Sequence, residues 1–286
     1  MKQYKYRQDQ LPTKNNSKLL TLVGDNKHVL EVGCAMGFHT RAMTEKQSCS
    51  VVGIEIDESQ AEQTRPFCEE LIVGDIETLN LSDKLEGRLF DVITFADVLE
   101  HLRDPAAALL KIRPFLSDKG YVVASIPNIA HCAVAFELAH GHFDYRQFGL
   151  LDNTHIHFFT KRTIFETFEK AGFLITELDR VRAKPSDTEF KTVPISPDDQ
   201  KLLDYIYRIN PESETYQFVI KAIPLEGQHS AKQAELITAT DKILSLETAL
   251  EANHERIRKL ESEIEWLDRK PIQRFKNLFS KSFRKP

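Results

Sequence analysis

A turn of small residues follows the first strongly apolar run of the chain. Residues 29–32 are suited to a buried parallel strand, which ends in Gly33-Cys34-Ala35-Met36-Gly37. Gly33 permits a tight turn, and Gly37 permits the close approach of another backbone or of a ligand. A strand that breaks into such a turn before a helix directs backbone N–H groups at a ligand. The stretch predicts a ligand site, although a purely structural turn would use the same residues.

Acidic residues follow three later apolar runs. Glu55 ends the run 50–55, Asp75 ends 71–75, and Asp97 comes shortly after 90–95. Glu55 lies about 20 residues beyond Gly33, close to the spacing at which doubly wound folds place a carboxylate on a ribose. A ribose presents two vicinal hydroxyl donors, and an ionised carboxylate accepts both. The spacing predicts a nucleoside ligand, whereas an acid at the surface end of a strand is the structural alternative.

Half of the ten histidines lie in residues 128–160. His131 and His155 are candidate general bases, because both follow the expected fifth strand, where an acceptor approaches, and histidine is the most frequent base. The histidines of 154–159 alternate with apolar residues, so either histidine could instead hydrogen-bond a loop in place. Histidine, cysteine and acidic residues are numerous, but no group has metal-ligand spacing. We therefore expect no required metal.

These residues need a scaffold that brings strand ends together. Short apolar runs at 29–32, 50–55, 71–75, 90–95, 120–126, 173–181 and 216–223 alternate with segments of helical pattern. The alternation predicts an α/β fold with a doubly wound, seven-stranded, mostly parallel sheet and helices on both faces. The candidate ligand residues all lie just after strands. That is the carboxyl edge, where open α/β sheets bind ligands.

The turn differs from those of two common nucleotide sites. Phe38 stands where a dinucleotide-binding turn has its third glycine, and the G-K-[ST] sequence of a phosphate loop is missing from the turn. The residues fit an adenosyl ligand without a pyrophosphate better than they fit NAD.

The motif series resembles that of class I S-adenosylmethionine (SAM)-dependent methyltransferases over residues 4–223. The matching blocks are Glu31-x-Gly33-x-Ala35-x-Gly37, Gly53-Ile54-Glu55, Gly74-Asp75-Ile76, and Phe90-Asp91-Val92 through Asp97-Val98-Leu99-Glu100-His101. Residues 125–131, 149–155 and 158–160 are similar to a bacterial branch associated with surface-polysaccharide biosynthesis. His157 departs from that branch, where arginine is more usual.

The resemblance implies a role for each matching residue. Gly33, Ala35 and Gly37 would bring backbone to the methionine part of SAM, Glu31 would belong to the same cofactor site, and Glu55 would hold the ribose. Ile56 would pack on the adenine, Asp75 and Ile76 would meet its amino edge, and Ala96 and Asp97 would lie near the sulfonium.

The implied activity is O-methylation of a sugar or glycolipid intermediate. A small molecule, a lipid quinone or a protein is the alternative acceptor. An alternative hypothesis from another class of function is an assembly protein, in which the coiled coil is the working part and the methyltransferase body is vestigial.

A different pattern begins after residue 225. Leu236, Ile243, Leu250, Ile257 and Ile264 recur every seven residues, with a second apolar series three positions later. This heptad predicts a coiled coil and a homo-oligomer. We expect a methyltransferase-like domain at 1–225, a coiled coil at 230–268 and a basic tail at 269–286. The tail is amphipathic and carries seven basic residues and no acid, which suits contact with an anionic membrane surface.

Composition narrows the classes of function and the cellular locations that remain. The net charge of the 286-residue chain is -5 in spite of the basic tail, so an acidic body argues against nucleic-acid binding. No apolar run reaches the ~20 residues of a membrane span, and the first residues lack the apolar core of a secretory signal. The four cysteines form no CxxC pair. We expect reduced thiols and a cytoplasmic location. The protein would be peripheral to the membrane if the tail binds it.

Overall fold

The computed structural model describes residues 14–192 and 196–225, together with residues 246, 249–250, 253–254, 256–261 and 264. The chain divides into two compact units, Met1–Gln228 and His229–Pro286. The coiled-coil prediction falls largely, and the basic tail wholly, outside the described residues. Within the described part, no helix is long and apolar enough to cross a membrane.

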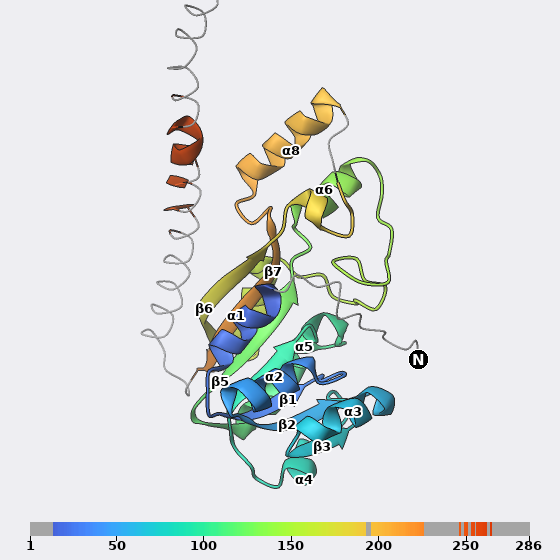
Figure 1. Ribbon diagram of the computed structural model, residues 1–286, viewed down its shortest axis with the longest axis vertical. Helices are drawn as coiled ribbons and strands as arrows, with labels where there is room; N and C mark the ends of the chain where they lie inside the picture. The colour runs from blue at the N-terminus through green and yellow to red at the C-terminus, as the bar shows by residue number, and fades with distance from the viewer. Residues whose placement is uncertain are drawn as a thin grey trace, which may run out of the picture. The chain divides into compact units, whose positions relative to one another are not determined.

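One seven-stranded sheet organises the first unit, with strand order β3-β2-β1-β4-β5-β7-β6 (Figure 1). Its strands are β1 (His28–Val32), β2 (Ser50–Glu55), β3 (Glu70–Val73), β4 (Phe90–Ala96), β5 (Leu116–Pro127), β6 (Phe173–Arg182) and β7 (Thr215–Pro224). Neighbouring strands pair in parallel from β3 to β5, whereas β7 pairs antiparallel with both β5 and β6. The predicted seven-stranded, mostly parallel sheet is confirmed.

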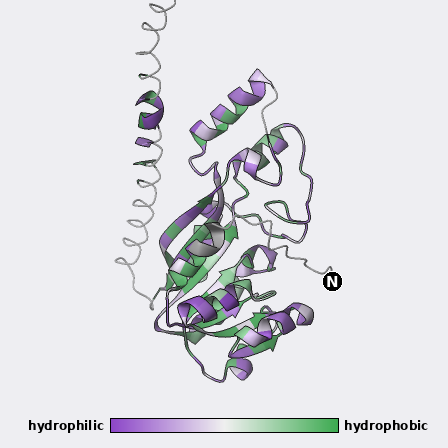
Figure 2. Ribbon diagram, in the orientation of Figure 1, coloured by the Kyte–Doolittle hydropathy of each residue, from purple (hydrophilic) through white to green (hydrophobic). Residues whose placement is uncertain are grey.

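Helices cover both faces of the sheet because side chains alternate along the strands. Val29 packs with residues of α1 (Lys14–Val23) and α2 (Phe38–Gln47), beside which lies α3 (Glu58–Thr64). Leu30 and Val32 pack instead with α4 (Leu81–Leu85), α5 (Pro105–Ile112) and α7 (Lys161–Lys170). Figure 2 shows the apolar sheet strands in green and hydrophilic residues in purple on helices such as α2. Single 3-10 turns lie at Arg65–Phe67, Leu99–His101, Arg113–Phe115 and Pro185–Asp187.

A helical pair lies beyond the ends of β6 and β7 (Figure 1). It consists of α6 (Cys132–Ala139) and α8 (Pro197–Ile209), which share a small apolar core of Cys132, Phe136, Leu203 and Ile206. His131, which the sequence places on the acceptor side, lies directly before α6. The pair follows the carboxyl end of β5, where this predicted acceptor-side residue lies.

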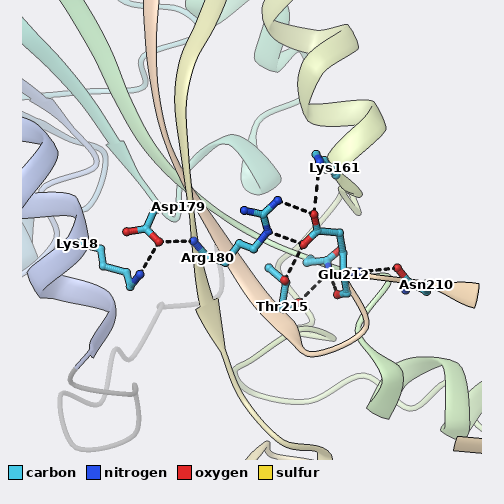
Figure 3. A network of polar contacts seen from close by, with 8 residues as sticks. Lys18, Lys161, Asp179, Arg180, Asn210, Glu212 and Thr215 are labelled. Carbon is cyan, nitrogen blue, oxygen red and sulfur yellow. Dashed lines mark hydrogen bonds and ion pairs between the residues drawn. The ribbon is translucent and has the colours of Figure 1, made fainter. Parts of the chain in front are cut away.

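An ion-pair network fixes the connection from α8 to β7 (Figure 3). Glu212 precedes β7, and its two carboxylate oxygens accept hydrogen bonds from Arg180 of β6 at 2.8 and 2.9 Å. Lys161 Nζ lies 3.4 Å away, and Thr215 donates at 2.8 Å. Burial by itself would raise the pKa of Glu212, but these donors hold it below its ordinary value. The network joins α7, β6 and β7 at the base of the helical pair.

The second unit contributes helical residues between 246 and 264. Its described apolar side chains, Leu246, Leu250, Ile257, Leu260 and Ile264, are each about half exposed. They belong to the heptad positions that the sequence pattern singles out. The predicted coiled coil and homo-oligomer stay predictions.

Candidate active site

Backbone hydrogen bonds to β2 and within the turn itself hold the glycine turn after β1. The N–H groups of Gly33 and Cys34 both donate to the carbonyl of Ile54, at 2.8 and 3.2 Å, and Gly37 N–H donates to Cys34 O at 2.9 Å. The expectation that these N–H groups are directed at a ligand is therefore wrong. Because the donors are used inside the protein, the turn offers a ligand close approach to small residues rather than an anion site.

Glu55 ends β2 and braces the same turn. One carboxylate oxygen accepts from Ala35 N–H at 2.8 Å, and the other accepts from Asp57 N–H at 2.9 Å. The side chain is only 6% exposed. Each carboxylate oxygen has a second lone pair, so the group can still accept from two vicinal hydroxyls. Its position beside the turn fits the ribose role that the sequence predicts.

Gly37 serves the packing of two helices. Its φ is +80°, and a Cβ there would lie 2.9 Å from Oγ1 and 3.1 Å from Cα of Thr64 in α3. Thr64 in turn donates to the carbonyl of Ala35 at 2.6 Å. Ala35 itself has a φ of +45°, a conformation that glycine adopts more readily. The close approach predicted for Gly37 is thus made by α3.

Glu31 lies beneath the turn, on the face of β1 that α2 covers. The side chain is buried and accepts a hydrogen bond from Thr40 of α2. Burial raises its pKa to about 8, and the nearby Glu55 contributes in the same direction. Glu31 therefore supports the turn as a neutral carboxylic acid at pH 7, and its predicted contact with a cofactor stays a prediction.

The residues predicted on the adenine side differ in exposure. Ile56 follows β2 directly and is 53% exposed, so its side chain is available to cover a ligand ring. Asp75 is half-buried after β3 and accepts from Glu77 N–H at 2.8 Å. The side chain of Ile76 belongs to the main hydrophobic core. An adenine contact by Ile76 would therefore have to come from its backbone.

Ala96 and Asp97 meet the glycine turn from the neighbouring strand. β4 pairs with β1, and a Cβ on Gly33 would lie 2.5 Å from the side chain of Val98. Asp97 N–H donates to Ser125 O at 3.1 Å, and its carboxylate accepts from the side chain of Gln217. Burial raises the pKa of Asp97 to about 7. Four strand ends thus bring Gly33, Glu55, Asp75 and Asp97 to one edge of the sheet, as predicted.

His131 caps helix α6. Its ring is fully buried, and Nδ1 accepts from Ala133 N–H at 3.2 Å. Nε2 lies 2.9 Å from the carbonyl of Ala183 and donates to it. Both ring nitrogens are therefore engaged by backbone, and burial lowers the pKa of the ring. This geometry favours a structural role for His131, so we base no catalytic proposal on it.

His155 is placed by a tight polar turn. Asp152 accepts from Thr154 N–H at 2.8 Å and from Thr154 Oγ1 at 2.5 Å, and its carbonyl accepts from His155 N–H at 3.1 Å. The side chain of His155 is 8% exposed. Burial and the neighbouring His101 lower its pKa to about 4, so the ring is neutral at pH 7.

Two residues of the segment after β4 converge on His155. The rings of His101 and His155 meet edge to face with centroids 4.8 Å apart, and a Glu100 oxygen lies 3.9 Å from Nε2 of His155. The backbone carbonyl of Glu100 also accepts the N–H groups of Ile156 and His157, at 2.9 and 3.0 Å. One ligand-type atom from each of Glu100, His101 and His155 lies within 4.8 Å of the others. The arrangement could hold a metal ion.

An aromatic cluster borders this group. Phe158 lies 6.3 Å from the His155 ring, and Phe143 and Tyr145 lie 5.9 and 6.4 Å from Phe158. Phe143 and Tyr145 are exposed. Exposed aromatic faces next to buried polar groups can bind a ring that carries hydroxyls.

A family model described as a methyltransferase domain matches residues 4–178. The chain belongs to this methyltransferase family. Among its relatives is a ubiquinone biosynthesis O-methyltransferase of Neisseria meningitidis, 32% identical over 106 residues, which are 36% of this chain and 44% of that protein. The chain thus spans less than half of that relative's length. The enzyme of the same name from Coxiella burnetii is 23% identical over 177 residues, 60% of this chain and 73% of its own.

The methyltransferase fold extends to solved structures. A SAM-dependent methyltransferase from Archaeoglobus fulgidus is similar with a TM-score of 0.51 and 17% identity, over 72% of this chain and 91% of that one. At this identity the likeness shows the fold alone.

Sequence reasoning missed the grouping of Glu100 and His101 with His155 in this methyltransferase. More than 50 residues separate His101 from His155, so spacing along the chain gave no metal signal. It also missed Asp152, Thr154 and Glu189, which hold the His155 loop. The acidic and histidine residues of the Asp97–His101 and Asp152–His155 motifs were the available signal, although only the first motif directly follows a strand, and the second lies in the loop between α6 and α7.

Proposed function

We propose that the chain is a SAM-dependent O-methyltransferase whose acceptor is a hydroxyl of a sugar or glycolipid. The observation that carries the proposal is the pairing of Glu55 with the glycine turn, beside Asp97, in a chain of the methyltransferase family. These residues fit an adenosyl sulfonium ligand. The Glu55 carboxylate would bind the ribose, the exposed Ile56 would cover the adenine, and the nearby acidic residues would lie close to the sulfonium.

Bound SAM supplies an electrophilic methyl group. The acceptor oxygen forms a bond to the methyl carbon, the carbon–sulfur bond breaks with its electron pair on sulfur, and the hydroxyl proton is transferred to water. Positive charge on sulfur is lost, so the main tasks of the protein are alignment and exclusion of water. Glu55 and the turn would orient the nucleoside, and the segment after β4 would lie at the reacting methyl.

The acceptor side is assigned to the edge where His155 meets the aromatic cluster. Phe143, Tyr145 and Phe158 present ring faces that suit the C–H face of a sugar or a flat aromatic ring. His155 and Glu100 lie next to them and would face the acceptor hydroxyl. The sugar assignment comes from the motif blocks 125–131 and 149–155.

A phenolic precursor of a lipid quinone is the second candidate acceptor. It is favoured by the names of the relatives from Neisseria meningitidis and Coxiella burnetii. The similarity covers less than half of the Neisseria meningitidis protein, so the phenolic acceptor is likewise a proposal for this chain. The two candidates differ in the acidity of the hydroxyl, because a phenol ionises far more readily than a sugar alcohol.

Acceptor profiling with methyl-labelled SAM tests the proposal. The full-length protein is incubated with nucleotide sugars, lipid-linked sugars and catechol-type phenols, and labelled products are identified by mass spectrometry. We expect a methyl ether on a sugar hydroxyl. A phenolic ether would replace the first candidate by the second, and label on nitrogen or carbon only would overturn O-methylation. Phe143→Ala and Tyr145→Ala should raise the KM for the acceptor without weakening SAM binding.

A further inference from the structure

A cluster of two buried and one half-buried ligand-type groups lies at the acceptor edge. It consists of Glu100 and His101, in the 3-10 turn after β4, and His155, in the loop before α7. One atom from each lies within 4.8 Å of the other two, and a Glu100 oxygen is 3.9 Å from His155 Nε2. Glu100 is 1% exposed. Two chain segments far apart in sequence thus place a carboxylate and two imidazoles around one point.

The carboxylate of Glu100 lacks the partners that its burial demands. Neither of its oxygens accepts a hydrogen bond within the described part of the chain, and Nδ1 of His155 is also without one there. Burial of an unpaired carboxylate is strongly unfavourable, so such groups usually bind a cation or a donor. The carboxyl groups of Asp97 and Asp152 lie near enough to interact electrostatically with Glu100. The cluster therefore has the electrostatics of a cation site.

The hydrogen bonds of His101 fix its tautomer in a form suited to a metal. Nδ1 lies 3.2 Å from both the carbonyl and the hydroxyl oxygen of Thr154. The Thr154 hydroxyl donates to Asp152, so its oxygen can only accept from the ring. Nδ1 therefore carries the proton, and the lone pair is on Nε2. A ligating histidine commonly donates its other N–H to a carbonyl in this way.

We propose that Glu100, His101 and His155 bind one divalent first-row transition ion, of which Zn²⁺ is the type. Two imidazoles and one carboxylate form a known ligand set of catalytic zinc, which leaves a fourth position open. Metal–ligand bonds of ~2.0–2.2 Å require the three groups to draw together by roughly 1 Å. Neutral imidazoles and a carboxylate suit an ion of intermediate softness, such as Zn²⁺, better than a soft ion that prefers thiolate ligands.

The open position would bind the acceptor hydroxyl, a step that rests on the proposed function. The ion lowers the pKa of the bound hydroxyl, as it does for zinc-bound water. The hydroxyl proton leaves to water, the oxygen forms its bond to the methyl carbon, and the carbon–sulfur bond breaks with both electrons on sulfur. In this account His155 is a ligand rather than the general base that the sequence predicts, and the expectation of no metal is revised.

Metal binding alone provides the test. The full-length protein, stripped with a chelator, is titrated with Zn²⁺ by calorimetry and with Co²⁺ by visible absorption. We expect one ion per chain, and at least a 100-fold loss of affinity in Glu100→Gln and in His155→Ala. His157→Ala is the matched control, because His157 bonds to Arg103 O and lies outside the cluster. It should keep the wild-type affinity.

Two results would overturn the metal site. One is a stripped wild-type protein that binds no ion, and the other is binding unchanged by both cluster variants. X-ray absorption of the Zn²⁺-loaded wild type needs no variant to fold, and it should show imidazole and oxygen ligands, whereas sulfur ligands would refute the site. Binding of S-adenosylhomocysteine (SAH), measured with chelator present, separates the two proposals. A protein that binds SAH normally but binds no Zn²⁺ would refute the metal site and leave the proposed function standing. A protein that does not bind SAH would refute the proposed function.

Discussion

Two carboxyl groups with opposite tasks lie under the glycine turn. Glu55 accepts backbone donors at the strand end, whereas Glu31 lies deeper and is held neutral by burial. A carboxyl in the deeper position supports the turn without adding a second negative charge beside Glu55. The cost is that the protein must keep a proton on Glu31 at a pH where the unfolded chain loses it.

Stability should therefore fall as pH rises through the window set by Glu31. Its pKa is raised from 4.5 to about 8 in the folded protein, so the folded state binds more protons between these values. The free energy of unfolding should decrease from pH 4.5 to 8, by roughly 3 to 5 kcal/mol from this group alone. Glu31→Gln keeps the acceptor for Thr40 and removes the titration.

Urea unfolding of the variant and the wild type from about pH 5 to about pH 9.5, on both sides of the folded pKa, measures this effect. The advantage of Glu31→Gln over the wild type should grow with pH and level off above pH 8. Glu45→Gln is the control, because Glu45 is an exposed partner of Arg41 on α2. A difference between Glu31→Gln and the wild type that stays constant with pH would contradict the account.

At the scale of elements, the loop from 146 to 155 is fixed by a distant acid. Glu189 accepts from Leu150 N–H at 2.6 Å and from Tyr216 Oη at 3.0 Å. Gly149 has a φ of +90°, and a Cβ there would lie 2.2 Å from a Glu189 oxygen. The glycine lets the loop close onto Glu189, and the loop then places Asp152 and His155.

Gly149→Ala should displace this loop and lower turnover by at least tenfold while SAH binding is retained. Gly141→Ala is a matched control, because its φ is +81° but nothing lies within 4 Å of the added Cβ. It pays only the left-handed strain, ~1 kcal/mol, and should keep its turnover. Steady-state kinetics with thermal unfolding compares the two, and equal effects would show that contact with Glu189 is unimportant.

The sequence predicts the sheet well because its strands are short, apolar and separated by helical patterns. All seven strands lie within a few residues of their predicted places, and Gly33, Glu55, Asp75 and Asp97 reach one edge because parallel strands end there. Contacts between distant loops leave no such periodicity. The cluster of Glu100 with His155, the capping role of His131 and the helix α6 depend on tertiary packing, so local pattern did not reveal them.

At the scale of the whole molecule, the two units follow different sequence periods. The first unit is an α/β body whose apolar side chains form a buried core, whereas the large described apolar side chains of the second unit are about half exposed. Apolar residues repeating every seven positions gain stability by packing against another helix. We propose that the second unit joins copies of the chain and that the basic tail adds membrane contacts which oligomerisation multiplies.

Removal of residues 230–286 should lower the oligomeric state and leave the first unit folded. Light scattering gives the mass of the full-length and shortened proteins, and turnover of the shortened protein reports its activity. Retained turnover with loss of the oligomer favours an enzyme whose second unit is for assembly. An unchanged number of chains per particle would contradict the heptad argument. Normal function in cells without turnover would favour the assembly-protein alternative.

The central claim is that the edge formed by Gly33, Glu55 and Asp97 binds SAM. Calorimetric titration of the full-length protein with SAH tests it most directly, with Glu55→Ala and the exposed neighbour Glu58→Ala alongside. We predict one site per chain in the wild type and in Glu58→Ala, and an affinity about 10- to 100-fold weaker in Glu55→Ala, as expected for lost charged hydrogen bonds. A wild-type protein that gives no binding, or a Glu55→Ala variant that binds SAH as tightly as the wild type, would contradict the account.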